Sequence, residues 1–509
     1  MTKYKFVVTI ALAMLTGIRG AAGPSSDAAS AVRSYCDSHQ AAILREFAEL
    51  LAIPNVASDA VNIRRNAALI SSMMERRGIA ARLIEGKGSP VVFGELRKPG
   101  ATRTIGIYAH YDGQPVDPAT WTTPPFKPTL RTGSIESGGA IVEFPKPGEK
   151  AGDEWRLYAR SASDDKAPIV ALMAALDALK ASRIEITSNL KFFFEGEEEA
   201  GSIHLEELLR RNKQLLDADA WICADGPVHQ TRKQAVFFGC RGVVSATITV
   251  YGANRGLHSG HYGNWAPNAA MMLAKLLASM KDDSGRVLIA GFYEGIEPLG
   301  EDEKRAIREM PDSDAQLMRE YGMAAAEGAG KSLAELINEP SLNVDGMRSE
   351  DIGAQARNIV PPEATATVDM RLVKGIEPAR QLQRLIAHIE KQGFHVVKET
   401  PSQEMRLKYP RIARVTSGDG YQAARTPMSL PICKQVIKAV EESTGSRPVL
   451  MPVLGGSAPL AVFASVTGIP QIGVPIVNHD NNQHSSNENL RLKNLWDGIV
   501  VLAGLMTMK

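Results

Sequence analysis

Apolar positions recur along the first half of the chain in two spacings that predict different elements. Residues 42–78 show the spacing of two amphipathic helices that divide near Pro54, and Gly78 suits the end of the second helix. Short apolar runs then alternate with helical patterns. The runs predict strands at 104–108, 155–158, 190–194 and 218–224, and the helical patterns predict helices at 167–180 and 204–212. Strands that alternate with helices indicate a mainly parallel α/β sheet.

The pattern changes near residue 240. Positions alternate between apolar and polar, as in half-exposed antiparallel strands, at 243–251 and 364–373, and helical patterns occur at 268–280 and 381–391. The earlier α/β pattern returns with helices at 430–442 and 457–467 and a strand at 471–477. We therefore predict an α/β domain formed by residues 23–240 and 414–509, interrupted by an α+β domain at 241–413. Two domains in tandem are the alternative.

The first residues have the pattern of a secretory signal peptide. Lys3 and Lys5 precede an apolar run at 6–15, and small residues follow at 20–23. The run is too short for a membrane span, which needs about 20 apolar residues. We predict a signal peptide at 1–22 and an exported protein, periplasmic or secreted, with no stable membrane association. A buried N-terminal helix is the alternative.

Composition limits the classes of protein that fit these patterns. The chain has 509 residues, which is too long for one ordinary core, and 44% apolar and 23% charged residues, which are globular values. Lysine and arginine total 58 against 57 acidic residues, without a basic block, so no nucleic-acid partner is expected. The four cysteines lack the short spacings of a thiolate metal site, and one disulfide stays possible.

Five clusters of metal-type side chains each follow a predicted strand or extended segment. They contain His110 with Asp112, Asp164 with Asp165, Glu195 to Glu199, Asp225, and the loop 478–485 with His479 and His484. A single acidic cluster is more often a solvated loop. Ligand sites of parallel sheets lie beyond the carboxyl ends of the strands, so we expect these five clusters to converge. Imidazole and carboxylate ligands without thiolate suit zinc, manganese or cobalt.

Spacing assigns two further roles. The side chains of His110 and Asp112 lie on the same side of an extended backbone, so Asp112 can accept the spare imidazole N–H and orient a ligating His110. Glu198 and Glu199 are adjacent and point in different directions. One of them can therefore ligate a metal while the other takes a proton from water.

These motifs jointly resemble the co-catalytic zinc metallopeptidases. That family includes carnosinases and other dipeptidases, glutamate carboxypeptidases, aminoacylase-1 and succinyl-diaminopimelate desuccinylase, and the chain is most similar to the carnosinase-type dipeptidases. The motifs are AHYDGQP at 109–115, SASDDKAP at 161–168, FEGEEEAGS at 194–202, LHSGHYG at 257–263 and HSSNE at 484–488. The resemblance implies a catalytic α/β domain with an inserted lid and dimerisation domain, and a homodimer.

The resemblance also implies residue roles. Asp164 would bridge two divalent metal ions, with His110 and Asp225 on one and Glu199 and His484 on the other; Glu198 would be the general base and Asp112 the orienter of His110. A cis peptide is implied between Asp164 and Asp165. His479 is the rival of His484, which alone begins the His-Ser-x-Asn-Glu pattern. His258 would reach the site of a neighbouring subunit, and the implied substrate contacts are Asn358, Arg371, Gly456 and Ser457.

The predicted activity is metal-dependent hydrolysis of the amide bond in dipeptides or short peptides with a free carboxylate. Two divalent ions, zinc or else manganese or cobalt, would activate water, and Glu198 would take its proton. Hydrolysis of N-acyl amino acids by the same residues is the first alternative. A binding protein without activity is the second, and it would require lost ligands, whereas all five ligands and the base are present.

Overall fold

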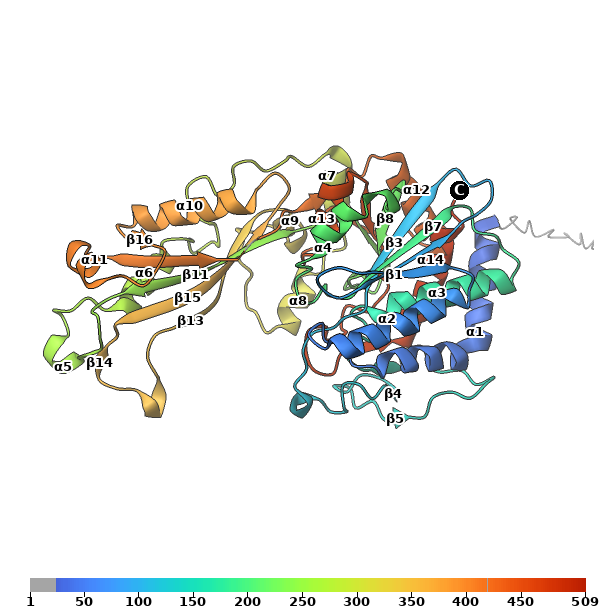
Figure 1. Cartoon of the computed structure of the whole chain (residues 1–509), viewed down its shortest axis with the longest axis horizontal. Helices are drawn as coiled ribbons and strands as arrows, with labels where there is room; N and C mark the ends of the chain where they lie inside the picture. The colour runs from blue at the N-terminus through green and yellow to red at the C-terminus, as the bar shows by residue number, and fades with distance from the viewer. Residues whose placement is uncertain (1–23, 419) are drawn as a thin grey trace, which may run out of the picture.

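The structure, a computed structural model, describes residues 24–418 and 420–509, and Figure 1 shows that they form two lobes. The predicted signal peptide lies outside the described residues. We call the larger lobe, formed by residues 24–240 and 424–509, the α/β lobe, and the elongated one, formed by residues 242–417, the lid lobe. Their strands belong to separate sheets.

An eight-stranded sheet runs through the α/β lobe in the order β1-β2-β7-β3-β8-β20-β9-β19. Its centre is parallel and consists of β7 (Asn189–Glu195), β3 (Thr104–His110), β8 (Ala220–Cys223) and β20 (Gln471–Gly473). The flanks consist of β1 (Ala80–Ile84), β2 (Val91–Leu96), β9 (Ala235–Phe237) and β19 (Val449–Met451). They join the centre through antiparallel pairs, and β9 and β19 pair with each other in parallel. The central strands are largely buried because helices cover both of their faces.

Helices cover the two faces of this sheet unequally. One face packs against α1 (Pro24–Leu51), α2 (Ala60–Glu75), α3 (Lys166–Ala181), α12 (Pro431–Thr444) and α14 (Leu492–Met506). The other face packs against α4 (Leu205–Arg211) and α13 (Leu460–Thr467). Local chemistry sets several helix ends: Asp59 accepts the N–H of Asn62 at the start of α2, and α12 ends at Gly445 in the left-handed conformation.

A second sheet of the α/β lobe is antiparallel and lies beside the first. Its order is β21 (Asn489–Arg491), β6 (Arg156–Tyr158), β4 (Thr129–Arg131) and β5 (Ile141–Val142). The strand expected at 155–158 therefore exists but pairs outside the parallel sheet. The Asp164 cluster therefore follows a strand of this antiparallel sheet, which the sequence pattern does not show because β6 has only three residues.

The lid lobe is built on a five-stranded sheet. Its order is β13 (Ser341–Arg348), β15 (Glu363–Leu372), β11 (Gly242–Tyr251), β17 (Ile412–Ser417) and β16 (His395–Val397). Helices α6 (Ala269–Ala278) and α10 (Pro378–Lys391) bury one face of this sheet. Burial alternates along β15, as the sequence pattern predicts. Strand β17 continues to Ser417, beyond the boundary predicted at 413.

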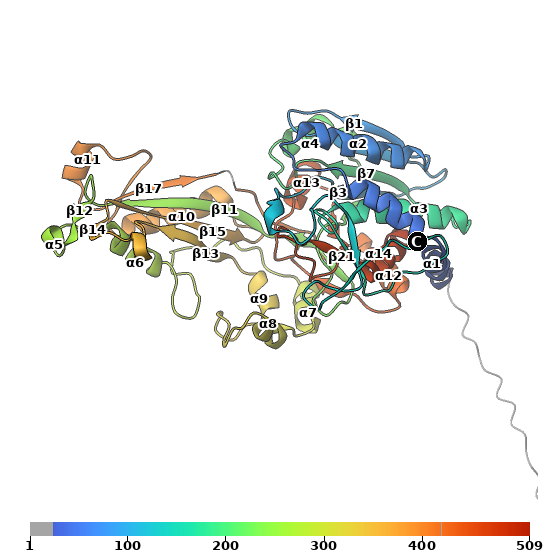
Figure 2. The same cartoon turned by 90° about the horizontal axis from the view of Figure 1, so that it is seen from below.

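Smaller elements complete the lid lobe and the junction between the lobes. Figures 1 and 2 place β12 (Leu257–His258), β14 (Ile359–Val360) and α5 (Ser259–Tyr262) at the end of the lid lobe that is far from the α/β lobe. The remaining helices are α7 (Glu301–Glu309), α8 (Asp314–Glu320), α9 (Leu333–Ile337) and α11 (Gln403–Lys408). The chain leaves the α/β lobe through β10 (Gly239–Cys240) and returns through β18 (Ala424–Arg425), and these two strands pair with each other.

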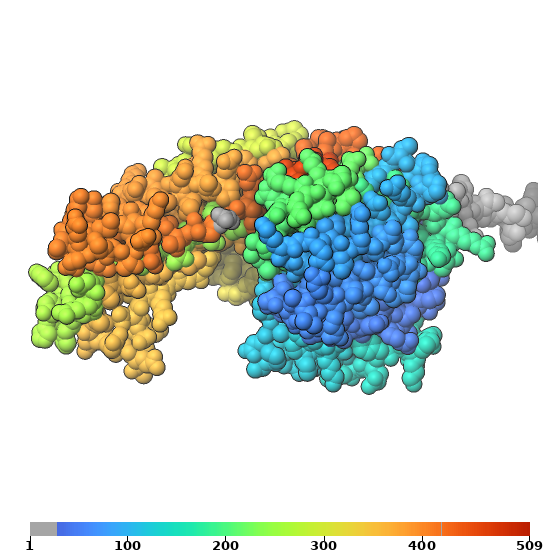
Figure 3. Space-filling model, viewed as in Figure 1, coloured from blue at the N-terminus to red at the C-terminus, as the bar shows by residue number. Residues whose placement is uncertain are grey.

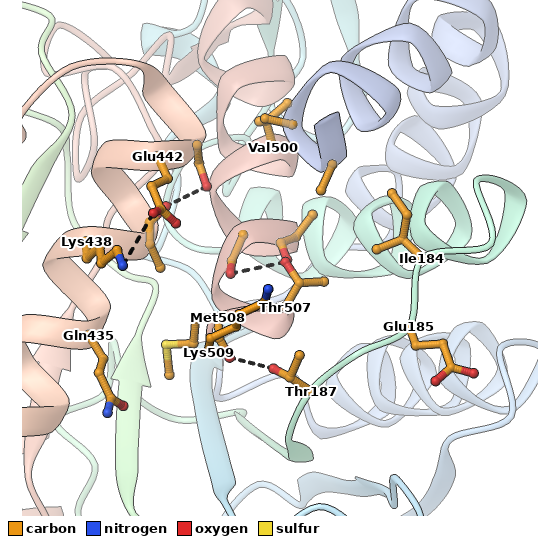
Figure 4. Close-up of a pocket in the computed structure, with 16 residues that line it drawn as sticks. Ile184, Glu185, Thr187, Gln435, Lys438, Glu442, Val500, Thr507, Met508 and Lys509 are labelled. Atoms are coloured by element: carbon orange, nitrogen blue, oxygen red, sulfur yellow. Dashed lines mark hydrogen bonds and ion pairs between the residues drawn. The ribbon is translucent and has the colours of Figure 1, made fainter. Parts of the chain in front are cut away.

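The observed architecture confirms the predicted fold class, a mainly parallel α/β sheet accompanied by an α+β lobe. Among the described helices, none has the length and apolar character that a bilayer crossing requires. All four cysteines lie within the described ranges, where they are buried and form no disulfide. A cavity of about 370 Å³ opens between α12, α14 and the start of α1, and none of the predicted site residues lines it (Figure 4).

Candidate metal centre

The candidate site begins where β3 and β7 end side by side. His110 and Glu195 are register partners at the ends of these strands, and the Tyr111 N–H donates to the Glu195 carbonyl at 2.8 Å. Gly196 allows the following loop to come close, because a Cβ there would lie 2.4 Å from the Tyr111 hydroxyl oxygen. The loop that carries Glu198 and Glu199 is thereby held beside His110.

Asp112 connects His110 to this acidic loop. Its two carboxylate oxygens accept the backbone N–H groups of Glu198 and Glu199, each at 3.0 Å. His110 Nδ1 lies 3.3 Å from Asp112 Oδ1, which leaves Nε2 free to face the site. The structure therefore gives Asp112 a contact that the sequence does not predict, because its carboxylate lies beside the His110 imidazole and also fixes the backbone of the acidic loop.

Asp164 lies at the centre of the site. Its Oδ1 is 3.0 Å from His110 Nε2, and its Oδ2 is 3.0 Å from His484 Nε2. The peptide bond to Asp165 is cis, as the resemblance implied. Asp165 Oδ2 in turn accepts the backbone N–H of His110 at 3.2 Å. The one carboxylate of Asp164 thus faces histidines from two distant parts of the chain.

Two overlapping groups of potential ligands follow from this arrangement. His110, Asp164 and Asp225 form the first group, and Asp164, Glu199 and His484 form the second. Within each group, one ligand atom of every residue lies within 4.8 Å of the others. Asp225 follows β8 closely, so adjacent strand ends bring it next to His110. These five residues are the ones that the sequence analysis selected as metal ligands.

The electrostatics of this cluster favours the binding of cations. Burial, together with the charge of Asp164, raises the pKa of Asp225 to about 6 and the pKa of Glu199 to about 7. Burial would also raise the pKa of Asp164, but hydrogen bonds from His110 and His484 lower it. The hydrogen bond with Asp164 raises the pKa of His484 to about 9. Buried carboxylates this close repel one another, and divalent cations would relieve the repulsion.

The donor set fits such cations. The ligand atoms are imidazole nitrogens and carboxylate oxygens, with no thiolate among them, which suits zinc, manganese or cobalt. Glu198 belongs to neither group, but its Oε2 lies 4.0 Å from His110 Nε2. Burial raises the pKa of Glu198 well above its usual range. The Glu198 carboxylate therefore lies beside the cluster and belongs to neither ligand group.

Arg371 and Ser457 join the two lobes near this cluster. Arg371, on β15, donates from a terminal guanidinium nitrogen to Ser457 Oγ at 3.0 Å and from Nε to Asp369 at 2.8 Å. Burial raises the pKa of the neighbouring Tyr421 to about 12. The charge of Glu198 adds to this rise, whereas the hydrogen bond with Ser457 and the charge of Arg371 oppose it. Gly456, beside Ser457, accepts the Arg241 N–H at 3.1 Å. Figure 3 shows the surface hollowed between the two lobes.

Two of the predicted residues are not brought to this cluster within one chain. His258, on β12, pairs with Ile359 of β14, and the Ser259 N–H donates to the Asn358 carbonyl at 3.0 Å. His258 and Asn358 are therefore neighbours, at the far end of the lid lobe (Figures 1 and 2). His479 lies outside both ligand groups.

Some residues that hold the ligands were missed by the sequence analysis. Gln114 donates to Glu199 at 2.8 Å and Gln483 donates to Asp164 at 3.2 Å. Glu488 accepts the backbone N–H of Asp164 at 2.8 Å. All three are inside or next to the motifs recognised in the sequence. Glutamine is not a typical metal ligand, and a single glutamate does not reveal which group it contacts. Only the folded structure shows which predicted ligand each of the three residues contacts.

Fold and donor set together define a metallohydrolase with a site at the ends of parallel strands. Comparison with known families places it more closely: the profile of peptidase family M20/M25/M40 matches residues 106–508. The chain belongs to this family and is a metallopeptidase.

Curated relatives and solved structures agree with this assignment. The mouse (Mus musculus) protein Beta-Ala-His dipeptidase is 27% identical over 425 residues, covering 81% of this chain and 78% of that protein. A Cys-Gly metallodipeptidase of Candida albicans is 26% identical over 424 residues, covering 82% and 81%. The M20 family metallo-carboxypeptidase Sso-CP2 from Sulfolobus solfataricus superposes with a TM-score of 0.75 at 26% identity, covering 91% of this chain and 98% of that chain. Human carnosine dipeptidase 1 shares the fold, with a TM-score of 0.71 at 21% identity over 94% of this chain and 98% of that one.

Proposed function

We propose that this chain hydrolyses the peptide bond of dipeptides or short peptides with a free carboxylate, using two divalent metal ions. The observation that carries the proposal is the pair of ligand groups that share Asp164. The preferred ion is zinc, with manganese or cobalt as alternatives. The substrate class is supported by relatives that are named as dipeptidases of Beta-Ala-His and of Cys-Gly.

Each residue of the site has a separate role in the proposed reaction. His110 and Asp225 would hold one ion, Glu199 and His484 the other, and Asp164 would hold both. Such ions supply Lewis-acid polarisation of a carbonyl and lower the pKa of water toward ~7. Glu198, 4.0 Å from His110 Nε2 and outside the ligand groups, accepts the proton of the attacking water and delivers it to the leaving amine. Arg371 can bind a substrate carboxylate with its planar guanidinium.

The active assembly in this proposal is a homodimer. His258 and Asn358 lie far from the metal cluster of their own chain, so a second copy must bring them to it if they contact substrate. The surface near them supports association: Trp265 is 78% exposed and Ile352 is 88% exposed. Strand β13, an edge of the lid sheet, is exposed over most of its length.

Export is the second part of the proposal. The charged, apolar and small-residue pattern of residues 1–22 supports a cleaved signal and a periplasmic or secreted enzyme. N-terminal sequencing of the protein from the periplasm or the medium should begin near residue 23. Recovery of the whole chain, with residue 1 intact, from the cell interior alone contradicts export.

Replacement of Glu198 tests the mechanism directly. Glu198→Ala should lower kcat at least about 100-fold on a dipeptide panel, because the general base is lost, while both metal equivalents remain bound. Metal analysis and chelator treatment accompany the assay, and chelator should abolish the wild-type activity. N-acyl amino acids in the same panel separate peptidase from deacylase activity.

Glu206→Ala is the matched control. Glu206 is exposed on α4 and pairs with Arg210 at 2.7 Å, so its loss should leave kcat unchanged. Near-wild-type turnover of Glu198→Ala with metal still bound would rule out Glu198 as the base.

A further inference from the structure

The carboxylate of Glu488 is fully buried and accepts four hydrogen bonds. Its Oε2 accepts from a terminal nitrogen of Arg160 at 2.8 Å and from the Ser161 N–H at 2.9 Å. Its Oε1 accepts from the Ser163 N–H at 2.9 Å and from the Asp164 N–H at 2.8 Å. The Arg160 guanidinium balances the buried negative charge. Such a cluster is costly to bury unless every acceptor is used, and here both oxygens are used twice.

All four donors belong to the turn that carries Asp164, whereas Glu488 belongs to the loop that carries His484. Glu488 ends that loop, directly before β21, which pairs with β6 next to the turn. Two further bonds join the same segments: the Ala159 N–H donates to the Glu488 carbonyl at 3.2 Å, and Ser163 Oγ donates to the Asn489 carbonyl at 2.8 Å. Glu488 therefore connects the residue shared by both ligand groups with a ligand of the second group.

We propose that Glu488 is a positioning residue that fixes Asp164 relative to His484, so that one carboxylate can serve both metal ions. The inference rests on the proposed function, since it concerns the same metal centre. The hydrogen bonds of the Glu488 carboxylate go to Arg160 and to backbone N–H groups, and none goes to a ligand atom of the two groups. Glu488 acts through the backbone of Asp164, and its removal frees the turn to rotate the Asp164 carboxylate away from one or both ligand groups.

The chemistry requires a carboxylate at this position. In Glu488→Gln, one side-chain oxygen becomes an NH₂ group, which is a donor only. Whichever way the amide lies, that NH₂ group faces two donors, either Arg160 with Ser161 or Ser163 with Asp164. At least two of the four hydrogen bonds are therefore lost, although the side chain keeps its size. A residue with a purely structural role would lower stability only, whereas a positioning residue also lowers metal affinity.

The test measures metal affinity and does not depend on catalysis. Metal-free wild type and Glu488→Gln are titrated with Zn²⁺ in competition with a chromophoric chelator, and folding is checked by circular dichroism and gel filtration. We expect both zinc equivalents of Glu488→Gln to bind about 10- to 100-fold more weakly, because both ions share Asp164.

Glu303→Gln is the matched control, because Glu303 is also buried but lies on α7 and accepts the Met428 N–H at 2.9 Å. It should be less stable than wild type but bind zinc with wild-type affinity. Wild-type affinity of Glu488→Gln for both equivalents would overturn the inference, as would an equal loss of affinity in Glu303→Gln.

A second variant covers the case in which Glu488→Gln does not fold. Glu488→Asp keeps the charge and its attraction to Arg160, but the shorter side chain cannot reach all four donors. It should fold and bind zinc with an affinity between those of wild type and Glu488→Gln, and wild-type affinity would again overturn the inference. The titration separates the two proposals. If the wild type does not bind two equivalents of zinc, the proposed metal centre itself is contradicted. If every Glu488 variant binds zinc as tightly as the wild type, only the role of Glu488 is contradicted.

Discussion

Asp480 illustrates how charged side chains outside the metal cluster support its loops. It lies on the loop 478–488, and its carboxylate pairs with Arg156 at 2.5 Å and with Arg491 at 2.8 Å. Both arginine side chains are nearly buried, with 8% and 2% exposure. Burial would raise the pKa of Asp480, but the hydrogen bond from Arg156 and further polar contacts lower it below its usual range. The native loop therefore requires the ionised carboxylate.

This lowered pKa predicts a pH-dependent stability. A group whose pKa is lower in the folded state contributes stability above its unfolded pKa, near 3.9 for aspartate, and loses it as pH falls through the folded value. Asp480→Asn should lower the free energy of unfolding by about 2 kcal/mol at pH 7, between the values for exposed and buried ion pairs. The difference from wild type should stay constant from pH 8 to pH 5 and shrink below about pH 4. Urea unfolding at each pH measures it.

An exposed aspartate provides the control. Asp37 pairs with Lys150 at 2.8 Å on the surface of α1 with a side chain that is 45% exposed, so Asp37→Asn should cost less than about 1 kcal/mol at every pH. A difference between Asp480→Asn and wild type that grows below pH 4 would contradict the assigned direction of the pKa shift.

Much of the metal cluster could be predicted from individual residues. His110, Glu199 and Asp225 lie at or shortly after the ends of buried strands, so sequence order alone puts them at one sheet edge. Asp164 was selected from its motif, although its strand, β6, belongs to the antiparallel sheet. Glu488 could not be assigned a contact, because its four donors are backbone and side-chain groups more than 300 residues earlier in the chain.

Among elements, long helices and central strands were easier to predict than short elements and those near the C-terminus. The structure places α3 and β7 within a residue or so of their predicted ranges, because each carries an uninterrupted apolar pattern. In contrast, α13 begins at Leu460 rather than at 457, since Gly455, Gly456 and Ser457 form the loop that contacts the lid lobe. The strand expected at 471–477 ends at Gly473, because the following residues leave the sheet toward the His484 loop. Tertiary contacts, which no local pattern records, decide such boundaries.

The arrangement of the two lobes leads to a prediction about the assembly. His258 is exposed on β12 at the far end of the lid lobe. If it acts in the site of a second copy, inactive Glu198→Ala and His258→Ala chains should complement each other. In a mixed dimer, the His258→Ala chain keeps its Glu198 and receives His258 from its partner. Random mixing should restore about a quarter of the wild-type activity.

Each variant measured alone is the control for this experiment and should remain inactive. Mixed dimers can be verified with two affinity tags carried by different chains. Absence of activity in verified mixed dimers would contradict action of His258 across the subunit boundary, while activity of His258→Ala alone would contradict its need in any arrangement.

The pairing of β10 with β18 has a consequence for how this chain could have arisen. Cys240 and Ala424 are partners in that pair. The chain therefore leaves the α/β lobe and returns to it at two positions that lie side by side. The entropy cost of closing a loop grows only slowly with the length of the inserted segment. An ancestral enzyme could therefore gain, exchange or enlarge a lid at this position while its sheet kept the same register. The β10–β18 pair is thus a position at which the lid, and with it the substrate preference, could change without altering the strands that carry the metal ligands.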